Sequence, residues 1–472
     1  MSVLLGGQLI SRMLLILYVA ALARYIGTEG IGKISSATAL NGLTVLLVAP
    51  GMTTLLVRDI ATNRKLSTTY LGNALFIRFL FSFPFIFLTI AIASIAGYSL
   101  DTMYIVFVYT LVYLFDAFGQ LISSIFQAFE AMEYDALTQV TRDFTNALLS
   151  LLCIYLRLPL LIIVIVSLVA QICKFILIVG IVHRRFIHIR LSVEPDTCKD
   201  LLIRSLPFGA LVILFSIRFQ LGIFILSLFD TASVVGIYSA ATTLVLMLLM
   251  LPTAFSSAVL PVFSRMYGDE RSTLPRFYQL SYKYLMIVGF LIGLVTIFFG
   301  GKIIEIIYGN EFKDASASII ILSVLCFTMM GYSNGPLLNA TGKQRFFAWT
   351  QTLLVLAETL LCLVFIPYLG PVGAALAIAI SSIGGLMIHS IACHHQFELS
   401  LPWALSLKTL LSTLFAGIAI FTANWLGVEW WVVLLIVTPI SYLAPIFLLK
   451  LVDFEEMRFL ASGVPRQIGE FE

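Results

Sequence analysis

The chain has 472 residues, of which 60% are apolar and 11% are charged, and its mean hydropathy is +1.04. Soluble domains carry about 25% charged residues, so this composition excludes a water-soluble globular protein. The formal net charge of +3 is small and gives no indication of nucleic-acid binding.

Apolar segments long enough to span a bilayer recur along the whole chain. A bilayer core needs about 20 consecutive apolar residues per helix. In chain order the segments cover residues 3–23, 34–57, 73–96, 103–126, 137–156, 159–182, 206–228, 234–262, 282–300, 316–338, 348–367, 371–393, 404–426 and 429–450. The sequence therefore predicts an all-α polytopic membrane protein with about 14 transmembrane helices.

The basic residues between these segments predict the orientation. The even-numbered loops and the C-terminal tail hold 18 Lys and Arg residues, whereas the odd-numbered loops hold 5. Positive charge is retained on the cytoplasmic side of a membrane. We therefore expect a multi-pass protein of the cell membrane with both termini in the cytoplasm.

Two pairs of similar strings indicate an internal repeat. GKISSATAL at residues 32–40 aligns with GIYSAATTL at 236–244, and QAFEAMEYDALT at 127–138 aligns with NATGKQRFFAWT at 339–350. Both pairs are shifted by six segments, an even number, so both copies enter the membrane in the same direction. This is the parallel-repeat arrangement of some transporters.

The repeat predicts the domain organisation. Residues 1–190 would form an N-terminal lobe of helices 1–6, and residues 200–396 a C-terminal lobe of helices 7–12 around a central cleft. Residues 402–472 would add two helices and a cytoplasmic tail outside the repeat. Two lobes around a cleft are suited to alternating access.

Basic and amide side chains within the segments are candidates for binding an anionic head group. A charge in hydrocarbon is costly, so an ionisable residue at this depth indicates a functional site. Arg12 lies one turn after Gln8 in the first segment, and Arg218 occupies a similar depth in the seventh. Lys174 lies in the sixth segment. Arginine suits phosphate because its planar fork donates two hydrogen bonds.

Acidic and amide side chains in two other segments are candidates for a polar cleft or for ion coupling. Asp116 and Gln120 are four residues apart in the fourth segment, and Gln351 and Glu358 are seven apart in the eleventh. Each spacing places both side chains on one face of a helix, which must then face protein or water. The alternative is that these groups form buried ion pairs that hold helices together.

The residues offer no catalytic constellation, metal site or cofactor motif. No Gly-rich phosphate loop is followed by Lys, so ATP hydrolysis is not indicated. His394 and His395 are adjacent and point about 100° apart on a helix, which favours a solvated pair over a metal site. We expect a transporter that is not an enzyme and has no cofactor.

Several strings resemble the polysaccharide-transporter family, the lipid-linked oligosaccharide flippases of the multidrug/oligosaccharidyl-lipid/polysaccharide exporter superfamily. They are QLISRMLLILYVAALARYIGTEGIGKIS (8–35), LVRDIA (56–61), FQAFEAMEYDAL (126–137), LPFG (206–209), VGIYSAATTL (235–244), IIYGNEF (306–312) and LLNATGKQRFFAWTQ (337–351). Each string is of low specificity, but their order and spacing extend over essentially the whole chain.

The resemblance implies a function. A member of this family moves a polyprenyl-(pyro)phosphate-linked oligosaccharide from the cytoplasmic to the outer leaflet by alternating access, for surface polysaccharide or glycan biosynthesis. Its partners are the lipid bilayer, this glycan substrate and glycan polymerase or ligase machinery. Related flippases also place an arginine at the position of Arg12. The chain departs from the family at Gln220, where an aspartate is common, and this puts cation coupling through that position in doubt.

Two other functions remain as alternatives. A cation-coupled small-molecule or drug exporter of the same superfamily would usually have twelve spans and an acidic pocket in the first lobe. A polytopic glycosyltransferase or polymerase would need a sizeable outer loop or paired carboxylates at an outer edge. The odd-numbered loops are short, and Asp101 and Asp230 stand alone in the sequence.

Overall fold

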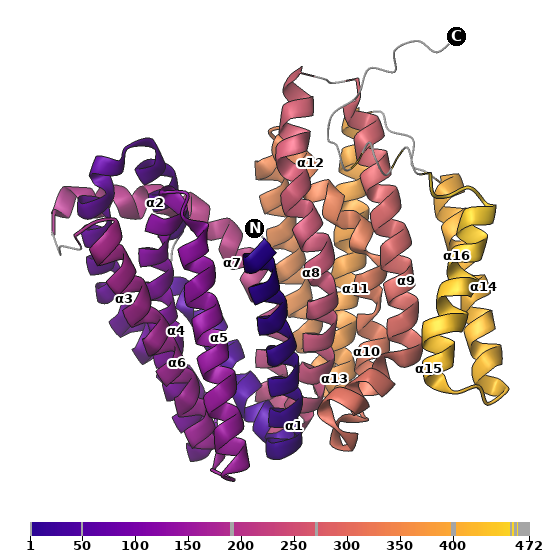
Figure 1. The fold of residues 1–472 in the computed structure, drawn as a ribbon, viewed down its shortest axis with the longest axis horizontal. Coiled ribbons are helices and arrows are strands. Elements are labelled where there is room, and N and C mark those ends of the chain that lie inside the picture. The colour runs from indigo at the N-terminus through magenta and orange to yellow at the C-terminus, as the bar shows by residue number, and fades with distance from the viewer. Residues whose placement is uncertain are drawn as a thin grey trace. The chain divides into compact units, whose positions relative to one another are not determined.

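The computed structural model describes residues 2–48, 51–188, 193–269, 272–397, 403–453, 456 and 460, with the side chains of 2–17, 47, 207–208, 210–216, 269, 396–397 and 403–404 left out. All regular structure in these ranges is helical. The helices of the first part are α1 (Ser2–Thr44), α2 (Met52–Thr62), α3 (Ser67–Ile95), α4 (Leu100–Ala128), α5 (Met132–Tyr155), α6 (Leu160–Arg185), α7 (Pro195–Phe229) and α8 (Ala232–Asp269). Those of the second part are α9 (Leu274–Tyr308), α10 (Ala315–Leu322), α11 (Val324–Phe327), α12 (Asn334–Ala340), α13 (Gln344–Phe397), α14 (Trp403–Trp425), α15 (Trp430–Val432) and α16 (Thr438–Leu448) (Figure 1).

The length and apolar composition of these helices confirm an all-α polytopic membrane protein. Among the described residues, 8 helices can cross a membrane, or 9 if the bent pair Ala315–Phe327 and Met329–Ala340 is one span. Large apolar side chains such as Phe79, Phe83 and Phe87 are exposed on α3. Exposed apolar surface of this kind is what a helix presents to lipid. The number of fourteen spans stays a prediction.

Two predicted loops are glycine kinks inside continuous helices. The backbone of Gly27 within α1 has φ 65°, and that of Gly370 within α13 has φ 54°. Glycine adopts such a conformation without the steric penalty that a side chain would bring. Helices α1 and α13 therefore each cover two of the predicted segments, one on either side of the kink.

Two predicted segments are broken rather than continuous. The segment predicted at 34–57 passes from α1 through a 3₁₀ turn at Val45–Leu47 to α2, with Gly51 in the left-handed conformation before α2. The segment predicted at 316–338 is divided into α10, α11, a 3₁₀ turn and α12, with a 43° bend. Composition alone does not reveal these breaks, because the residues at them remain largely apolar.

The chain forms two compact units by its internal contacts. Residues 1–239 and 307–312 make up the first unit, and residues 240–306 and 313–472 the second. Helix α7 and the start of α8 thus belong to the first unit by contact, whereas the repeat assigns them to the C-terminal lobe. The units are defined by contacts within the structure and the lobes by the sequence repeat, so the two divisions need not coincide. The lobe boundaries stay a prediction.

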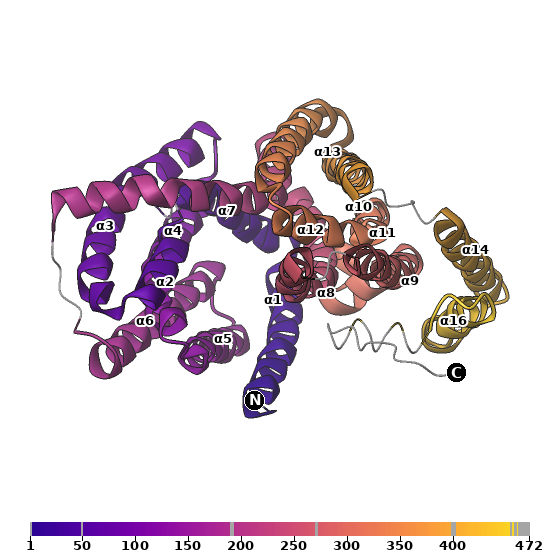
Figure 2. The same cartoon turned by 90° about the horizontal axis from the view of Figure 1, so that it is seen from above.

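In the first unit, α4 packs against both α3 and α6, and α1 packs against α4 and α5 (Figure 2). Helix α7 packs on α1, α2 and α3. Buried apolar side chains from α2, α3, α4 and α6 form one core of this unit, including Leu55, Leu121, Phe126 and Ile178. These contacts fix the helix faces that carry the polar groups described below.

In the second unit, α10 and α12 pack on α13, and α14 packs on α16. The pair formed by α14 and α16 is joined to α9 by a buried apolar cluster. Within it, the hydroxyl of Tyr442 donates a hydrogen bond of 2.7 Å to the carbonyl oxygen of Ile287. The last helices are therefore attached to the body of this unit through α9.

Helices α1 and α8 approach each other backbone to backbone at two glycines. A Cβ on Gly32 would lie 1.6 Å from the carbonyl oxygen of Ala232, and a Cβ on Gly236 would lie 2.0 Å from that of Thr28. Only glycine permits this distance, as in small-residue helix contacts within membranes. We call this contact, formed by residues 28–35 and 232–239, the glycine seam.

Candidate functional site

Asp116 is the centre of a polar cluster between α4 and α6. Its carboxylate accepts hydrogen bonds from Gln120 at 2.7 Å, from Gln171 at 3.0 Å and from Lys174 at 3.1 Å. Gln120 follows Asp116 by one helical turn on α4, and Gln171 and Lys174 lie within one turn on α6. Two polar stripes, each on one helix, thus meet face to face.

The cluster is closed at Lys174 and more open at Asp116. The side chain of Lys174 is 8% exposed and that of Asp116 is 29% exposed, while Gln120 is exposed. Removing one partner of such a pair leaves an uncompensated charge away from water. Lys174 therefore needs Asp116, while the amide of Gln120 lies on the exposed side of the cluster.

Arg78 adds a second positive charge beside this cluster. It is fully buried on α3, and its guanidinium donates hydrogen bonds to the carbonyl oxygens of Val48 and Ala117. Its charge and that of Asp116 are close enough to attract each other. The carbonyl of Val48 lies at the break after α1 and that of Ala117 lies within α4, so Arg78 ties α3 to both.

Arg78 is not among the residues predicted from the sequence, although the signal is present. It is a basic residue inside the apolar segment 73–96, which by the same principle that selected Arg12 marks a functional or structural site. With Lys174 and Asp116 it gives the cluster two positive charges and one negative charge. The local excess is positive, but it belongs to an arginine that is fully enclosed by protein.

A second polar layer lies next to the first in the same unit. The hydroxyl of Ser167 donates to the amide oxygen of Asn146 at 3.1 Å. Tyr18 of α1 lies near Asn146 and Ser150 of α5, and Tyr109 of α4 lies near Ser167 of α6. Polar side chains from four helices of the first unit therefore lie close together at this level, and the bond from Ser167 to Asn146 joins α6 to α5.

The second unit has its own buried polar centre at the bent segment. Asn334, at the start of α12, accepts a hydrogen bond from the hydroxyl of Tyr278 at 2.7 Å and donates to Ser390 at 3.0 Å. The hydroxyl of Ser256 donates to the carbonyl oxygen of Tyr332 at 3.0 Å, which satisfies backbone exposed by the break. Interrupted helices of this kind occur at binding sites of transporters.

The structure brings together three of the predicted site residues, namely Asp116, Gln120 and Lys174. The ion pair of Asp116 and Lys174 agrees with the structural alternative that the sequence left open, and a role in binding or coupling stays a prediction. Glu358 is buried and Gln351 is half-buried on α13, in the second unit. Their assignment to a polar cleft also stays a prediction.

The remaining predicted residues lie on α1 and α7 of the first unit. Arg218 is half-buried on α7. The side chains of Gln8 and Arg12 lie outside the described residues, and only their place within α1 is given. Gln220, which stands where an aspartate was expected, packs against α1, since a Cβ on Gly42 would lie 3.1 Å from its Cγ. Anion binding by Arg12 and Arg218 stays a prediction.

The described residues contain no group of three or more His, Cys, Asp or Glu side chains that is placed to hold a metal ion. The polar clusters are instead composed of amides, hydroxyls and single charges. Such groups can bind polar or anionic parts of a ligand by hydrogen bonds.

The chain matches a known protein family over more than half of its length. The family described as polysaccharide biosynthesis protein matches residues 1–267, which is more than half of the chain. The chain belongs to this family. A curated relative is the capsular polysaccharide biosynthesis protein CapF of Staphylococcus aureus, which is 27% identical over 157 residues, or 32% of this chain. The match spans 39% of the length of that relative.

Solved structures show that the chain has the fold of known polytopic transporters. The lipid II flippase MurJ in an inward closed conformation matches 96% of this chain and 100% of its own, with a TM-score of 0.78 and 16% identity. An inward-facing multidrug resistance MATE family transporter matches 82% of this chain and 94% of its own, with a TM-score of 0.70 and 13% identity. At these identities the likeness concerns the fold.

Proposed function

We propose that this polysaccharide biosynthesis protein flips a polyprenyl-(pyro)phosphate-linked oligosaccharide from the cytoplasmic to the outer leaflet. The observation that carries the proposal is the fold shared with the lipid II flippase over 96% of this chain. Membership of a polysaccharide biosynthesis family supports a glycan as the cargo. The polar clusters inside apolar helices supply hydrogen-bonding groups at a depth where a polar head group would have to be bound.

The transport step would use alternating access between the two predicted lobes. Arg12 and Arg218 would hold the phosphate groups in the cleft, because a guanidinium matches two phosphate oxygens at once. Gln8 would add a hydrogen-bond donor one turn from Arg12. The polyprenyl tail would stay in the bilayer beside the lobes, so only the polar part of the substrate would cross.

Lys174 has a different role in this proposal. Its ammonium is bonded to Asp116 at 3.1 Å and is nearly buried, so its charge is compensated before a substrate arrives. We assign it, with Asp116, to holding α4 and α6 together beside the cleft. Gln120, Gln351 and Glu358 would line the polar path.

The cellular setting follows from the same proposal. The protein would reside in the cell membrane with both termini in the cytoplasm, and the glycan would be handed to polymerase or ligase machinery on the outer side. It would act as a transporter and not as an enzyme. Export of small cationic drugs is less well supported, because Asp116, the acid of the polar cluster between α4 and α6, is already paired with Lys174.

Leaflet-resolved counting of lipid-linked oligosaccharide in cells that lack this protein tests the function. We expect the oligosaccharide to accumulate on the cytoplasmic leaflet and the wild-type protein to clear it. If the amount of lipid-linked oligosaccharide and its distribution between the leaflets are unchanged, the proposal is contradicted and drug export becomes the favoured function.

Two substitutions test the proposed head-group site. Arg12→Ala and Arg218→Ala should each abolish clearance without preventing membrane insertion. Arg345→Ala is the matched control, since Arg345 is exposed at the start of α13. Normal clearance by both well-expressed variants would exclude an anion site at these arginines.

A further inference from the structure

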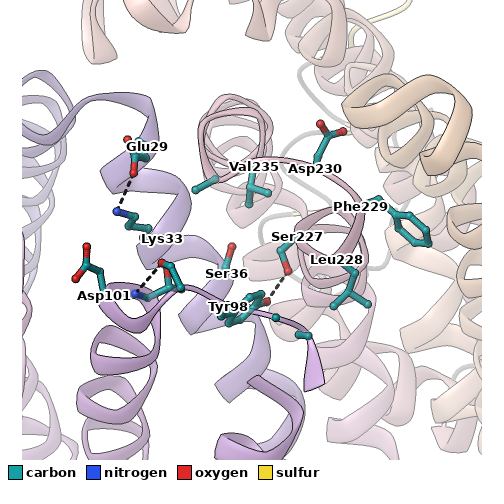
Figure 3. A pocket seen from close by; sticks show the side chains of 15 residues that line it. Glu29, Lys33, Ser36, Tyr98, Asp101, Ser227, Leu228, Phe229, Asp230 and Val235 are labelled. Atoms are coloured by element: carbon teal, nitrogen blue, oxygen red, sulfur yellow. Dashed lines mark hydrogen bonds and ion pairs between the residues drawn. The ribbon is translucent and has the colours of Figure 1, made fainter. Parts of the chain in front are cut away.

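A cavity of about 570 Å³ lies in the first unit, away from the cluster at Asp116. Its walls come from α1 after the Gly27 kink, from the turn between α3 and α4, and from the junction of α7 and α8 (Figure 3). All three segments belong to odd-numbered loops or to the helix ends beside them. The cavity is therefore on the face that the basic residues predict to be outside.

The polar side chains of this cavity are held in place by one another. Glu29 and Lys33 form an ion pair at 2.8 Å. The hydroxyls of Tyr98 and Ser227 are hydrogen-bonded at 2.6 Å, which joins the α3–α4 turn to α7. Ser36 also lines the cavity and is buried, although it carries a hydroxyl. A rigid polar wall of this kind loses little side-chain freedom when a ligand binds.

The charge of the cavity is negative. Glu29 is offset by Lys33, whose hydrogen bond and charge lower the pKa of that carboxyl. Asp101 and Asp230 line the same cavity, and neither forms an ion pair with a basic residue in the part of the chain that the structure describes. They are 129 residues apart in the sequence, but the fold places both in the wall of one cavity.

The uncharged groups favour a ligand rich in hydroxyls. Ser227 donates its hydrogen to the carbonyl oxygen of Phe224, so the Tyr98 hydroxyl donates to Ser227 and can still accept a hydrogen bond from a ligand hydroxyl. Carboxylates accept hydrogen bonds from ligand hydroxyls, and serine and threonine hydroxyls do either. The volume falls within the range of about 300–1,000 Å³ that small-molecule sites occupy. An acidic ligand would meet the uncompensated charge of Asp101 and Asp230.

We propose that this cavity binds sugar residues of the glycan on the outer face and selects neutral or amine-bearing sugars over acidic ones. The proposal rests on the function proposed above, because it takes its ligand from the glycan cargo. It assigns to Asp101 and Asp230 the role of accepting hydroxyl or ammonium hydrogen bonds. The hydrogen-bonded pair of Tyr98 and Ser227 would form the wall against which the sugar lies.

The test is a binding titration of the full chain in lipid nanodiscs at pH 6.5, measured by isothermal titration calorimetry. Three matched probes are a neutral disaccharide, the corresponding disaccharide of glucosamine and that of glucuronic acid. We expect the first two to bind and the third to bind at least tenfold more weakly. Equal affinity for all three, or no binding of any, would overturn the proposal.

Two variants connect such binding to the cavity. Asp101→Asn and Asp230→Asn should each lower the affinity for the neutral probe about tenfold, since each removes a charge-assisted hydrogen bond. Each should also reduce the discrimination against the acidic probe. Asp314→Asn is the matched control, because Asp314 is an exposed carboxylate in another odd-numbered loop, outside this cavity. Unchanged affinities in both cavity variants would overturn the assignment.

The two proposals fail in different ways. If wild-type protein clears lipid-linked glycan from the cytoplasmic leaflet but binds none of the three probes, the cavity proposal alone is overturned. If the probes bind as expected but clearance does not depend on the protein, flipping is overturned and the cavity remains a saccharide site.

Discussion

The hydroxyl of Ser35 donates a hydrogen bond of 2.8 Å to the hydroxyl of Ser239, and the two residues are 204 positions apart. The same offset separates Gly32 from Gly236, which pack backbone to backbone in the glycine seam. The relationship is reciprocal, since each glycine faces the carbonyl of the residue four positions before the other. Residues that the sequence repeat makes equivalent therefore meet as partners, as they would across a two-fold axis.

Enlarging either glycine of the seam should destabilise the protein. In Gly32→Ala and in Gly236→Ala, the added methyl would lie within 2.0 Å of a backbone oxygen, so α1 and α8 must separate. We expect a loss of about 3 kcal/mol from such overpacking, measured as a lower melting temperature of the purified protein. Gly180→Ala is the control, because a Cβ there meets nothing within 4 Å. Equal melting of seam and control variants would contradict close packing at the seam.

Covalent closure of the seam should stop transport. Ser35 and Ser239 belong to opposite predicted lobes, which must move apart on one side of the membrane in alternating access. The double variant Ser35→Cys with Ser239→Cys should form a disulfide under mild oxidation, because the hydroxyls it replaces are 2.8 Å apart. We expect glycan clearance to be lost on oxidation and restored by reductant. The single variant Ser35→Cys controls for oxidation of the native cysteines, and normal clearance by the crosslinked protein would contradict opening at this seam.

The parts of the fold that the sequence predicts are those encoded locally. Apolar runs identify the helices, and a spacing of four residues places Asp116 and Gln120 on one face. The bond from Asp116 to Lys174 spans 58 positions and depends on the packing of α4 against α6, which periodicity does not describe. The meeting of Asp101 and Asp230 in one cavity has the same origin. The breaks between α10, α11 and α12 are not predicted from the sequence, because a helix can bend without any change in the hydropathy of its residues.

Variants of the ion pair of Asp116 and Lys174 distinguish a structural role of the pair from a role in coupling. Asp116→Asn leaves the nearly buried Lys174 without its counter-charge, which should cost about 3 kcal/mol of stability. The double variant Asp116→Asn with Lys174→Gln removes both charges and should recover most of this loss. We expect glycan clearance to recover with it, as measured in the leaflet assay. A double variant that is stable but inactive would show that Asp116 or Lys174 takes part in transport itself.

Arg78 should be required for stability in a way that lysine does not satisfy. Its planar guanidinium reaches the carbonyls of Val48 and Ala117 with different nitrogens, and the ammonium of Arg78→Lys cannot reproduce that fork. One carbonyl would then be left without its donor, at a cost of about 1–3 kcal/mol. We therefore expect a lower melting temperature for Arg78→Lys and little change for Arg345→Lys, whose side chain is exposed. If Arg78→Lys melts like the wild type but loses glycan clearance, the guanidinium acts on the transport cycle instead, and the positive excess beside Asp116 becomes part of the substrate path.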